Sequence, residues 1–348
     1  LPPPTGRMNE TVRDTSPEPL IPGCKILDRY VIESKIAIGG HSVVYRGMDE
    51  RLSRPVCVKA FYKLETDSGI WQTAYEHFVQ EAFALSKLSH PNTLRIYDYG
   101  QLEGPDDTMV PVQVSEFMAG GTLAHLVGRG GVLPLPIAVG IMVKLAEALS
   151  EAHKLYIVHR DIKPQNILFT VGGKAREPKL ADFGIAKSVA LNNVDNQAEE
   201  TKVVVGFPLA MFSPSWGAPE QLCGAPPTHL IDIYSLGLIT VFALAGKAVC
   251  KSSSAQEGYN KRKKATELIG DALGDAKVPG AMVRFLQQAC AFNPADRPAT
   301  ADDFADGLRA ALHTPAKAAI PRFQPMAKSP PPSTAVQAKG TLSTRKVA

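Results

Sequence analysis

The chain has 348 residues, of which 45% are hydrophobic and 21% charged, so it has enough apolar side chains for a large packed domain. Its five cysteines are scattered without a CxxC pair, which argues against a disulfide framework or zinc site and favours a reducing, cytoplasmic compartment. The net charge is +4, but residues 315–348 hold six cations and no acid, so the remainder carries 4 − 6 = −2 and is not a basic nucleic-acid-binding domain.

The amino-terminal part is predicted to be rich in strands. Residues 1–22 are polar and proline-rich, without an apolar period, and predict a disordered segment. Apolar residues at helical spacing predict a helix at 78–88. The strands predicted from short runs of β-forming residues are 30–32, 42–45, 55–59, 93–99 and 111–117. Together these elements indicate a small β-rich lobe over about residues 23–119.

The pattern becomes helical after Gly120-Gly121 and predicts a larger helical lobe over about residues 120–314. An amphipathic helix begins near Ile137. Further helices are predicted at 231–246, 280–291 and 301–312. The run 231–246 is the longest apolar stretch, but it contains polar residues and is too short to span a bilayer comfortably. It therefore predicts a buried core helix rather than a membrane segment.

Two basic segments lie in the carboxy-terminal half. Residues 315–348 are proline-rich and of low complexity, and they predict a disordered, solvated tail; contact with an acidic partner or a membrane surface is the alternative. Residues 251–264, which include the run Lys261-Arg262-Lys263-Lys264, predict a solvated surface loop. Docking of an acidic substrate is the alternative for this loop.

One short segment gathers an acid, a cation and an amide. Residues His159-Arg160-Asp161-Ile162-Lys163-Pro164-Gln165-Asn166 are followed, sixteen residues after Asn166, by Asp182-Phe183-Gly184. An amide and an acid that can hold a metal ion, with a second acid that can take a proton, are the parts that phosphoryl transfer from ATP requires.

On these motifs, and on Ala218-Pro219-Glu220-Gln221, the chain resembles the eukaryotic-like (Hanks-type) Ser/Thr protein kinases, especially their bacterial branch, from about residue 30 to 312. The resemblance implies an α+β, bilobal protein kinase fold with a small β-rich N-lobe and a larger helical C-lobe. It implies an enzyme that transfers the γ-phosphoryl group of ATP to Ser/Thr hydroxyls of protein substrates and of itself. ATP and Mg²⁺ (or Mn²⁺) are the cofactors expected. The Lys163-Pro164 pair is typical of Ser/Thr rather than Tyr kinases.

The resemblance assigns the chemistry of the catalytic loop. Asp161 would orient the attacking hydroxyl and accept its proton, and Lys163 would neutralise the migrating phosphoryl group. Asn166 and Asp182 would bind the metal ion, since hard oxygen ligands suit Mg²⁺.

The ATP site is assigned in the same way. Lys59 would contact the α- and β-phosphates and pair with Glu81 on the helix 78–88. The Glu116 carbonyl and the Met118 amide would pair with the adenine edge. Ser115 would occupy the gatekeeper position, where a small side chain leaves a back pocket open.

The glycine-rich loop departs from the pattern GxGxxGxV of the family. Only Gly39 is kept, while Ala37 and Ser42 replace the outer glycines. Glycine lets backbone amides approach phosphate closely, so we expect a stiffer loop that still binds ATP through Ala37 and Gly39. Val44 would pack on the adenine from one side, and Cys57 would lie over the adenine where the family usually has alanine.

Two residues are assigned to regulation. Arg160 needs an anion, which a phosphate on the activation loop would supply, and Thr201 is the candidate phosphorylation site. An ordinary polar loop threonine is the alternative for Thr201. The segment 191–212 is longer than is common in the family.

Four further residues are assigned structural roles. Ser213 would bond Asp161 and Lys163, and Glu220 would pair with Arg297. Asp232 would accept hydrogen bonds from the backbone of the catalytic loop. Rigid support of this kind places the reacting atoms.

Two alternatives to an active enzyme stay open. A pseudokinase or scaffold module would keep the fold and bind ATP without turnover, and the two substituted glycines favour it. An interaction protein would act through its proline-rich tails. Nucleic acid is not an expected partner. The chain begins with Leu1 and can be a fragment of a longer, membrane-anchored protein.

Overall fold

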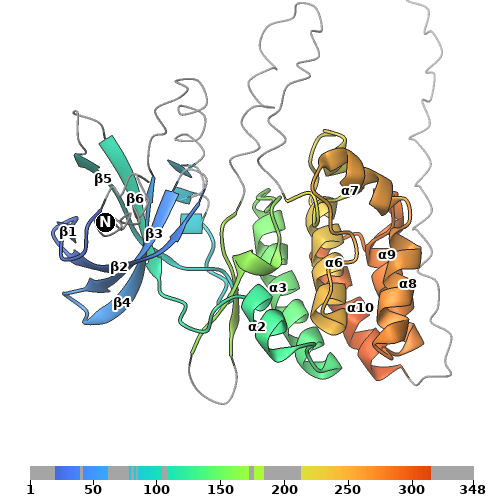
Figure 1. Ribbon diagram of the computed structural model, residues 1–348. Coiled ribbons are helices and arrows are strands. Elements are labelled where there is room, and N and C mark those ends of the chain that lie inside the picture. Colours follow the sequence, from blue (N-terminus) through green and yellow to red (C-terminus); the bar gives the residue numbers. More distant parts are fainter. Residues whose placement is uncertain are drawn as a thin grey trace, which may run out of the picture.

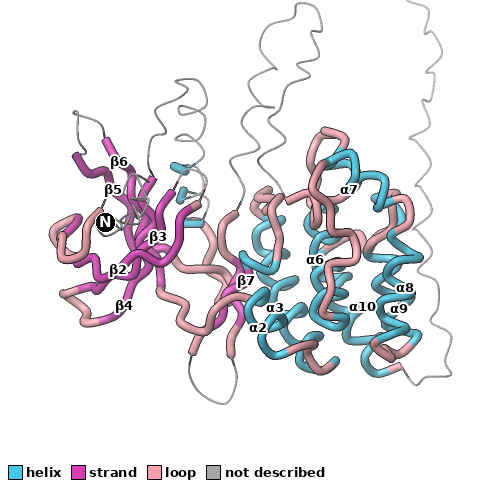
Figure 2. The backbone as a smooth tube through the Cα atoms, viewed as in Figure 1, coloured by secondary structure: helices cyan, strands magenta, loops and turns pink. Residues whose placement is uncertain are grey.

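The computed structural model describes residues 20–39, 42–61, 78–79, 82–83, 85–103, 109–171, 176–183 and 213–314 (Figure 1). Glu81 and Thr201 lie outside these ranges, as do residues 1–19 and 315–348, where disorder is predicted. Within the described ranges the six-stranded sheet forms one lobe, together with helical residues at 78–79, 82–83 and 85–86, where the sequence predicts a helix. The remaining helices gather in the other lobe together with a small hairpin (Figure 2). The architecture is the bilobal α+β arrangement that the sequence predicts.

The first lobe is built on a six-stranded antiparallel sheet with the strand order β1-β2-β3-β4-β6-β5. The strands are β1 (Lys25–Ile26), β2 (Tyr30–Ile38), β3 (Ser42–Asp49), β4 (Arg54–Phe61), β5 (Ile96–Glu103) and β6 (Met109–Glu116). Apolar side chains that alternate along the central strands are buried in one cluster, which includes Tyr30, Tyr45, Val58 and Val114. The alternation of buried and exposed side chains along the strands therefore places the apolar residues in the core of this lobe.

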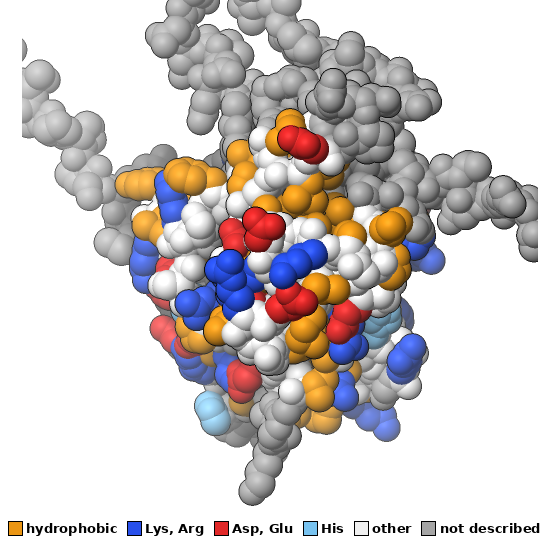
Figure 3. Space-filling view, turned by 90° about the vertical axis from the view of Figure 1, so that its left-hand side faces the viewer, with side chains coloured by type: hydrophobic (Ala, Val, Ile, Leu, Met, Phe, Trp, Pro, Cys, Tyr) orange, Lys and Arg blue, Asp and Glu red, His pale blue; other side chains and the backbone are white. Residues whose placement is uncertain are grey.

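The outer face of the β-rich lobe mixes both signs of charge (Figure 3). Lys25 pairs with Glu50 at 2.6 Å, and Arg46 pairs with Glu33 at 2.7 Å. On its described part this face does not form the basic stripe that marks nucleic-acid-binding surfaces.

The second lobe packs its helices around α6 (Leu230–Ala245), which is buried along almost its whole length. A helix that is apolar all round belongs in a core, so the sequence prediction for 231–246 is confirmed. The other helices are α2 (Leu123–Gly130), α3 (Leu135–Lys154), α5 (Pro219–Leu222), α7 (Ala255–Arg262), α8 (Ala265–Asp275), α9 (Gly280–Ala289) and α10 (Ala301–His313). Along the part of the chain that the structure describes, no helix is long and apolar enough to cross a membrane.

A small hairpin joins the two lobes. Its strands are β7 (Ile167–Phe169) and β8 (Pro178–Leu180). The strand predicted at 93–99 begins only at Ile96, because Leu94 N donates to Leu180 O at 2.9 Å and Thr93 bridges to the same residue. The backbone of residues 93–94 thus forms hydrogen bonds with the hairpin and not with the sheet.

The predicted lobe boundary coincides with a close backbone approach. A Cβ added to Gly120 would lie 2.5 Å from Phe169 O, and Gly120 N donates to that oxygen at 2.8 Å. Only glycine fits here without displacing the hairpin.

The prediction of a solvated loop at 251–264 is wrong. Helix α7 occupies most of this segment, and the Ser254 hydroxyl caps it by accepting from Glu257 N. Arg262 at its end is only 1% exposed. The sequence did not predict this helix because two residues of its buried face, Ala255 and Gly258, are small and form no apolar pattern at helical spacing.

Candidate active site

The catalytic loop connects α3 to β7 and is held by the first turn of α6. Asp232, which is 1% exposed, accepts from His159 N at 2.8 Å and from Arg160 N at 2.9 Å. His153 Nε2 lies 2.9 Å from the same carboxylate. Burial opposes the charge on Asp232, but the hydrogen bond with His153 helps to keep its pKa below the ordinary value. The contact predicted between Asp232 and the loop backbone is present.

Asp161 and Asn166 are tied together within the loop. Asn166 ends a 3₁₀ turn (Pro164–Asn166) and donates its Nδ2 to Asp161 O at 3.0 Å. Because a carbonyl can only accept, this bond fixes the amide orientation and turns Oδ1 away from Asp161 O. Lys163 Nζ lies 2.6 Å from Asp161 Oδ2.

The hydrogen bonds predicted from Ser213 to Asp161 and Lys163 are absent from the described contacts, and that prediction is wrong for this structure. Asp161 pairs with Lys163 directly. Ser213 instead begins a turn, in which its carbonyl accepts from Trp216 N at 3.0 Å.

Lys59 reaches across from the sheet to the second lobe. Its Nζ lies 3.0 Å from Asp182 Oδ1, although the two residues are 123 positions apart in the chain. The charge on Lys59 is the main reason that the pKa of Asp182 falls below its ordinary value. Asp182 is half-exposed and has a φ of 55°, a left-handed conformation that is uncommon outside glycine. Strain of this kind is concentrated at functional sites.

The sheet face that carries Lys59 also carries the predicted adenine residues. Val44 lies opposite Lys59 between β3 and β4, and Cys57 lies opposite Ser115 between β4 and β6. Since side chains two apart in a strand share a face, these four side chains line the same side of the sheet. Burial raises the pKa of the Cys57 thiol to about 11.

The glycine loop is the turn between β2 and β3. Gly39 N donates to Ser42 O at 2.7 Å, and Ala37 lies opposite Val44 in the register. Ala37 and Gly39 are exposed. The described part of the loop therefore opens toward the face with Lys59, where the sequence predicts phosphate.

Glu116 closes β6 at the predicted hinge. Its carboxylate accepts from Arg95 N at 2.8 Å and pairs with Lys179 Nζ at 2.7 Å. Both side chains of this pair are mostly buried. Met118 follows in the connection to α2, so the predicted hinge backbone lies between the lobes.

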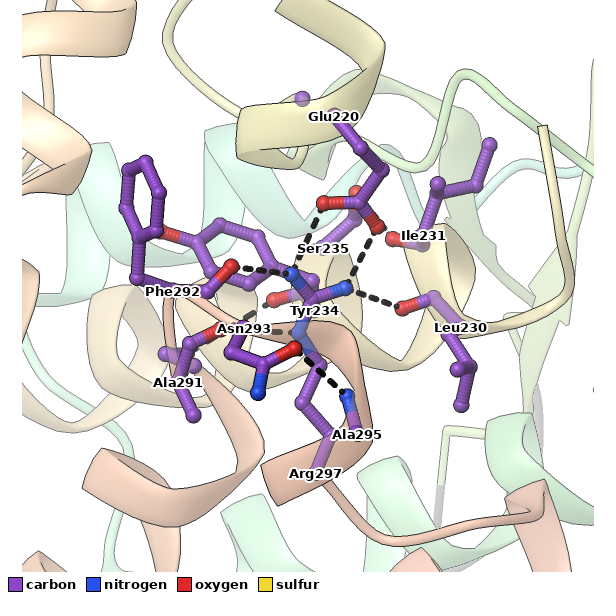
Figure 4. Close-up of polar contacts among 12 residues, drawn as sticks. Glu220, Leu230, Ile231, Tyr234, Ser235, Ala291, Phe292, Asn293, Ala295 and Arg297 are labelled. Carbon is purple, nitrogen blue, oxygen red and sulfur yellow. Dashed lines mark hydrogen bonds and ion pairs between the residues drawn. The ribbon is translucent and has the colours of Figure 1, made fainter. Parts of the chain in front are cut away.

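Figure 4 shows the polar contacts around Arg297. Arg297 binds the Glu220 carboxylate through Nη1 at 2.6 Å and Nη2 at 2.8 Å, so the predicted pair is present. Three backbone carbonyls complete the guanidinium contacts, those of Ala291, Leu230 and Phe292. On α5, Gln221 Nε2 donates to Arg160 O at 2.7 Å, which connects α5 to the catalytic loop.

Comparison with known proteins identifies this arrangement. The family model described as "Protein kinase domain" matches residues 30–307. The chain belongs to the protein kinase family.

Relatives of this kinase domain include bacterial Ser/Thr protein kinases. The serine/threonine-protein kinase PknK of Mycobacterium tuberculosis is 36% identical over 276 residues, which is 79% of this chain and 23% of that protein. PknL of the same species is 32% identical over 296 residues, covering 85% of this chain and 68% of PknL. Pkn3 of Myxococcus xanthus is 31% identical over 294 residues, which is 83% of this chain and 51% of Pkn3. The chain thus spans about a quarter of PknK and two thirds of PknL.

The solved structures confirm the protein kinase fold. The crystal structure of the Mycobacterium tuberculosis PknI kinase domain matches with a TM-score of 0.59 at 22% identity. The match covers 84% of this chain and 99% of that domain.

Sequence reasoning missed several residues that position the site of this kinase domain. His153 braces Asp232, Lys179 holds Glu116, and Gln221 holds the catalytic-loop backbone. Lys179 stands three residues before Asp182, in a run whose partner the sequence does not reveal. A single cation between the apolar residues Pro178 and Leu180 would have been the signal, since a buried lysine needs an acid.

Proposed function

We propose that this protein is an active Ser/Thr protein kinase that transfers the γ-phosphoryl group of ATP to hydroxyls of protein substrates. The observation that carries the proposal is the ion pair of Lys59 with Asp182, since these are the cation that would bind phosphate and the acid that would bind the metal ion. Asp161, Lys163 and Asn166 lie on the adjoining loop. Lys163 also lowers the pKa of Asp182, so these charged groups, which phosphoryl transfer would require, lie near one another among the described residues.

The donor set fits a divalent cation. Asp182 offers a half-exposed carboxylate, and Asn166 keeps its amide oxygen after its nitrogen has bonded Asp161 O. Hard oxygen ligands of this type suit Mg²⁺ or Mn²⁺. When bound, the ion would neutralise charge on the phosphate oxygens.

The residues of the chain would then share the remaining work. Lys59 binds the phosphates by exchanging its contact with the Asp182 carboxylate for contacts with phosphate oxygens. Asp161 accepts a hydrogen bond from the acceptor hydroxyl and takes its proton at Oδ. Lys163, already 2.6 Å from Asp161, supplies positive charge where the phosphoryl group moves.

Regulation by an anion is proposed for Arg160. Its Nε and Nη1 are buried and have no hydrogen-bond partner in the described structure, and burial lowers its pKa. A phosphate on the activation loop would satisfy both nitrogens. Thr201 is the proposed site of that phosphate.

Radiolabelled ATP with Mg²⁺ tests the proposal, with the protein alone and with a generic basic acceptor protein. Transfer that disappears in Asp182→Asn and Asp161→Asn, but persists in Asp271→Asn, is the expected result. Asp271 is an exposed acid on α8 and serves as the matched control for the same chemical change.

Bound ATP without transfer would instead indicate a scaffold that keeps the fold, and would overturn the proposal. Phosphoamino-acid analysis of the product tests the acceptor class. Phosphoserine and phosphothreonine are expected, and phosphotyrosine alone would contradict the assignment to the Ser/Thr class.

A further inference from the structure

Arg262 is a buried cation whose described contacts are all to neutral groups. It lies at the end of α7 and is 1% exposed, whereas its neighbours Lys263 and Lys264 are exposed. Among the described residues it forms no ion pair with an acid. A buried charge is unfavourable unless it is fully hydrogen-bonded, so this side chain has a specific task in the fold.

Its hydrogen-bond partners are four backbone carbonyls, and three of its five hydrogen bonds go to one short segment. Nε and Nη2 donate to Gly217 O at 3.0 and 2.9 Å, and Nη2 also donates to Pro214 O at 2.9 Å. Weaker bonds run from Nη1 to Cys250 O at 3.3 Å and Gly258 O at 3.5 Å. The planar guanidinium thus binds both ends of the segment 214–217, which the point charge of a lysine would not do.

The rest of α7 and the loop before it hold the same segment. Ser215 Oγ donates to Ser252 O at 3.2 Å and accepts from Ser252 N at 3.1 Å. A Cβ added to Gly258 would lie 2.9 Å from Pro214 O, so the helix comes as close as the backbone allows. Gly258 and Arg262 are four residues apart and therefore share the inner face of α7.

This segment lies beside the catalytic loop. It runs directly into α5, where Gln221 Nε2 bonds Arg160 O, the residue next to Asp161. In Figure 1 the yellow chain before α6 runs beside both the catalytic-loop region and α7. Gln221 thus brings this segment next to the residue before Asp161, and because an extended peptide spans about 3.3 Å per residue, residues flanking an acceptor hydroxyl at Asp161 can reach it.

We propose that Arg262 is a positioning residue that holds the segment 213–217 as a fixed docking surface for the acceptor peptide. It thereby sets the affinity for the protein substrate and the preference for residues next to the acceptor hydroxyl. The inference rests on the proposed kinase function. It assigns Arg262 no contact with ATP, whose predicted ligands lie on the sheet and the catalytic loop.

The test compares Arg262→Lys with the matched control Lys264→Ala, since Lys264 is an exposed cation two residues away. For Arg262→Lys, kcat/KM for an acceptor peptide should fall roughly 10- to 100-fold through a higher KM. The KM for ATP and the hydrolysis of ATP without acceptor should stay within about twofold, since displaced positioning affects only the peptide. Lys264→Ala should match the wild type in all four quantities.

A second variant acts on the same segment through the inner face of α7. Gly258→Ala should push Pro214 away and produce the same selective fall in kcat/KM for the acceptor peptide. Hydrogen exchange supplies a readout that needs no activity: the amides of Trp216 and Gly217, which donate to Ser213 O, should exchange faster in Arg262→Lys.

Two results would overturn the role of Arg262. One is unchanged peptide kinetics and unchanged exchange in Arg262→Lys. The other is an equal loss of ATP hydrolysis and peptide phosphorylation, which would mark a general structural role. If the wild type transfers no phosphate, the proposed function fails separately. In that case the affinity of a fluorescent acceptor peptide, measured by anisotropy, decides for or against Arg262.

Discussion

Replacement of Glu220 by alanine should destabilise the protein strongly, because it leaves the Arg297 cation buried without its acid. The Arg297 side chain is fully buried and the Glu220 side chain is 14% exposed. Removing one partner of a buried pair typically costs about 3–5 kcal/mol. Three backbone carbonyls still bind the guanidinium in the variant, which places the expected loss near the lower end, about 3 kcal/mol. For a domain of this size that corresponds to roughly 5 °C in Tm.

Urea unfolding followed by circular dichroism measures this loss, with calorimetry for the Tm. The control is Asp275→Ala, which removes the acid from an exposed pair with Lys247 at 3.2 Å and should cost about 0–1 kcal/mol. A double-mutant cycle with Arg297→Met should recover part of the loss, because the second change removes the stranded charge. Equal stabilities of Glu220→Ala and Asp275→Ala would refute the argument.

Three further predictions address charge, reactivity and specificity. The bond from Arg29 lowers the pKa of buried Asp49 to about 2, from an ordinary 3.8. The stabilisation that ionised Asp49 contributes is present above pH 4 and is lost as the pH falls toward 2. Asp49→Asn should therefore flatten the acid side of a plot of the urea midpoint against pH. Iodoacetamide at pH 8 should label exposed Cys223 before Cys57, whose pKa is raised to about 11 by burial, and mass spectrometry showing the reverse order would contradict this. Ser115→Phe should weaken ATP-site inhibitors with a bulky group at least about tenfold in a kinase assay; unchanged potency would mean that Ser115 does not border the pocket.

Much of the fold follows from local patterns. The helix at 231–246 was predictable because a largely apolar run of that length is buried on all sides, and α6 occupies it almost residue for residue. The strands of the first lobe were predictable from their β-forming residues. The strand at 93–99 was placed too early because the backbone at Thr93 and Leu94 pairs with Leu180, a partner 86 residues further along the chain.

Charged runs were the least informative part of the sequence. The run Lys261-Arg262-Lys263-Lys264 predicts one solvated segment. Within it, however, only Arg262 is fully buried. Nothing in the run distinguishes this residue, because its partners are backbone carbonyls that any sequence possesses. Lys179 escaped notice for a related reason, since its acid, Glu116, is distant in the chain.

The sequence by itself determined the chemistry of the site. The spacing from Asp161 through Asn166 to Asp182 is local, and short spacings in one loop and one hairpin leave little freedom in how the groups meet. Only the tertiary structure decided which groups face one another across the lobes. Lys59 meets Asp182 at 3.0 Å because Thr93 and Glu116 connect the first lobe to strand β8, and Arg262 turns inward because α7 packs against the segment 214–217. Such contacts depend on the packing of elements far apart in the chain, which no local pattern records.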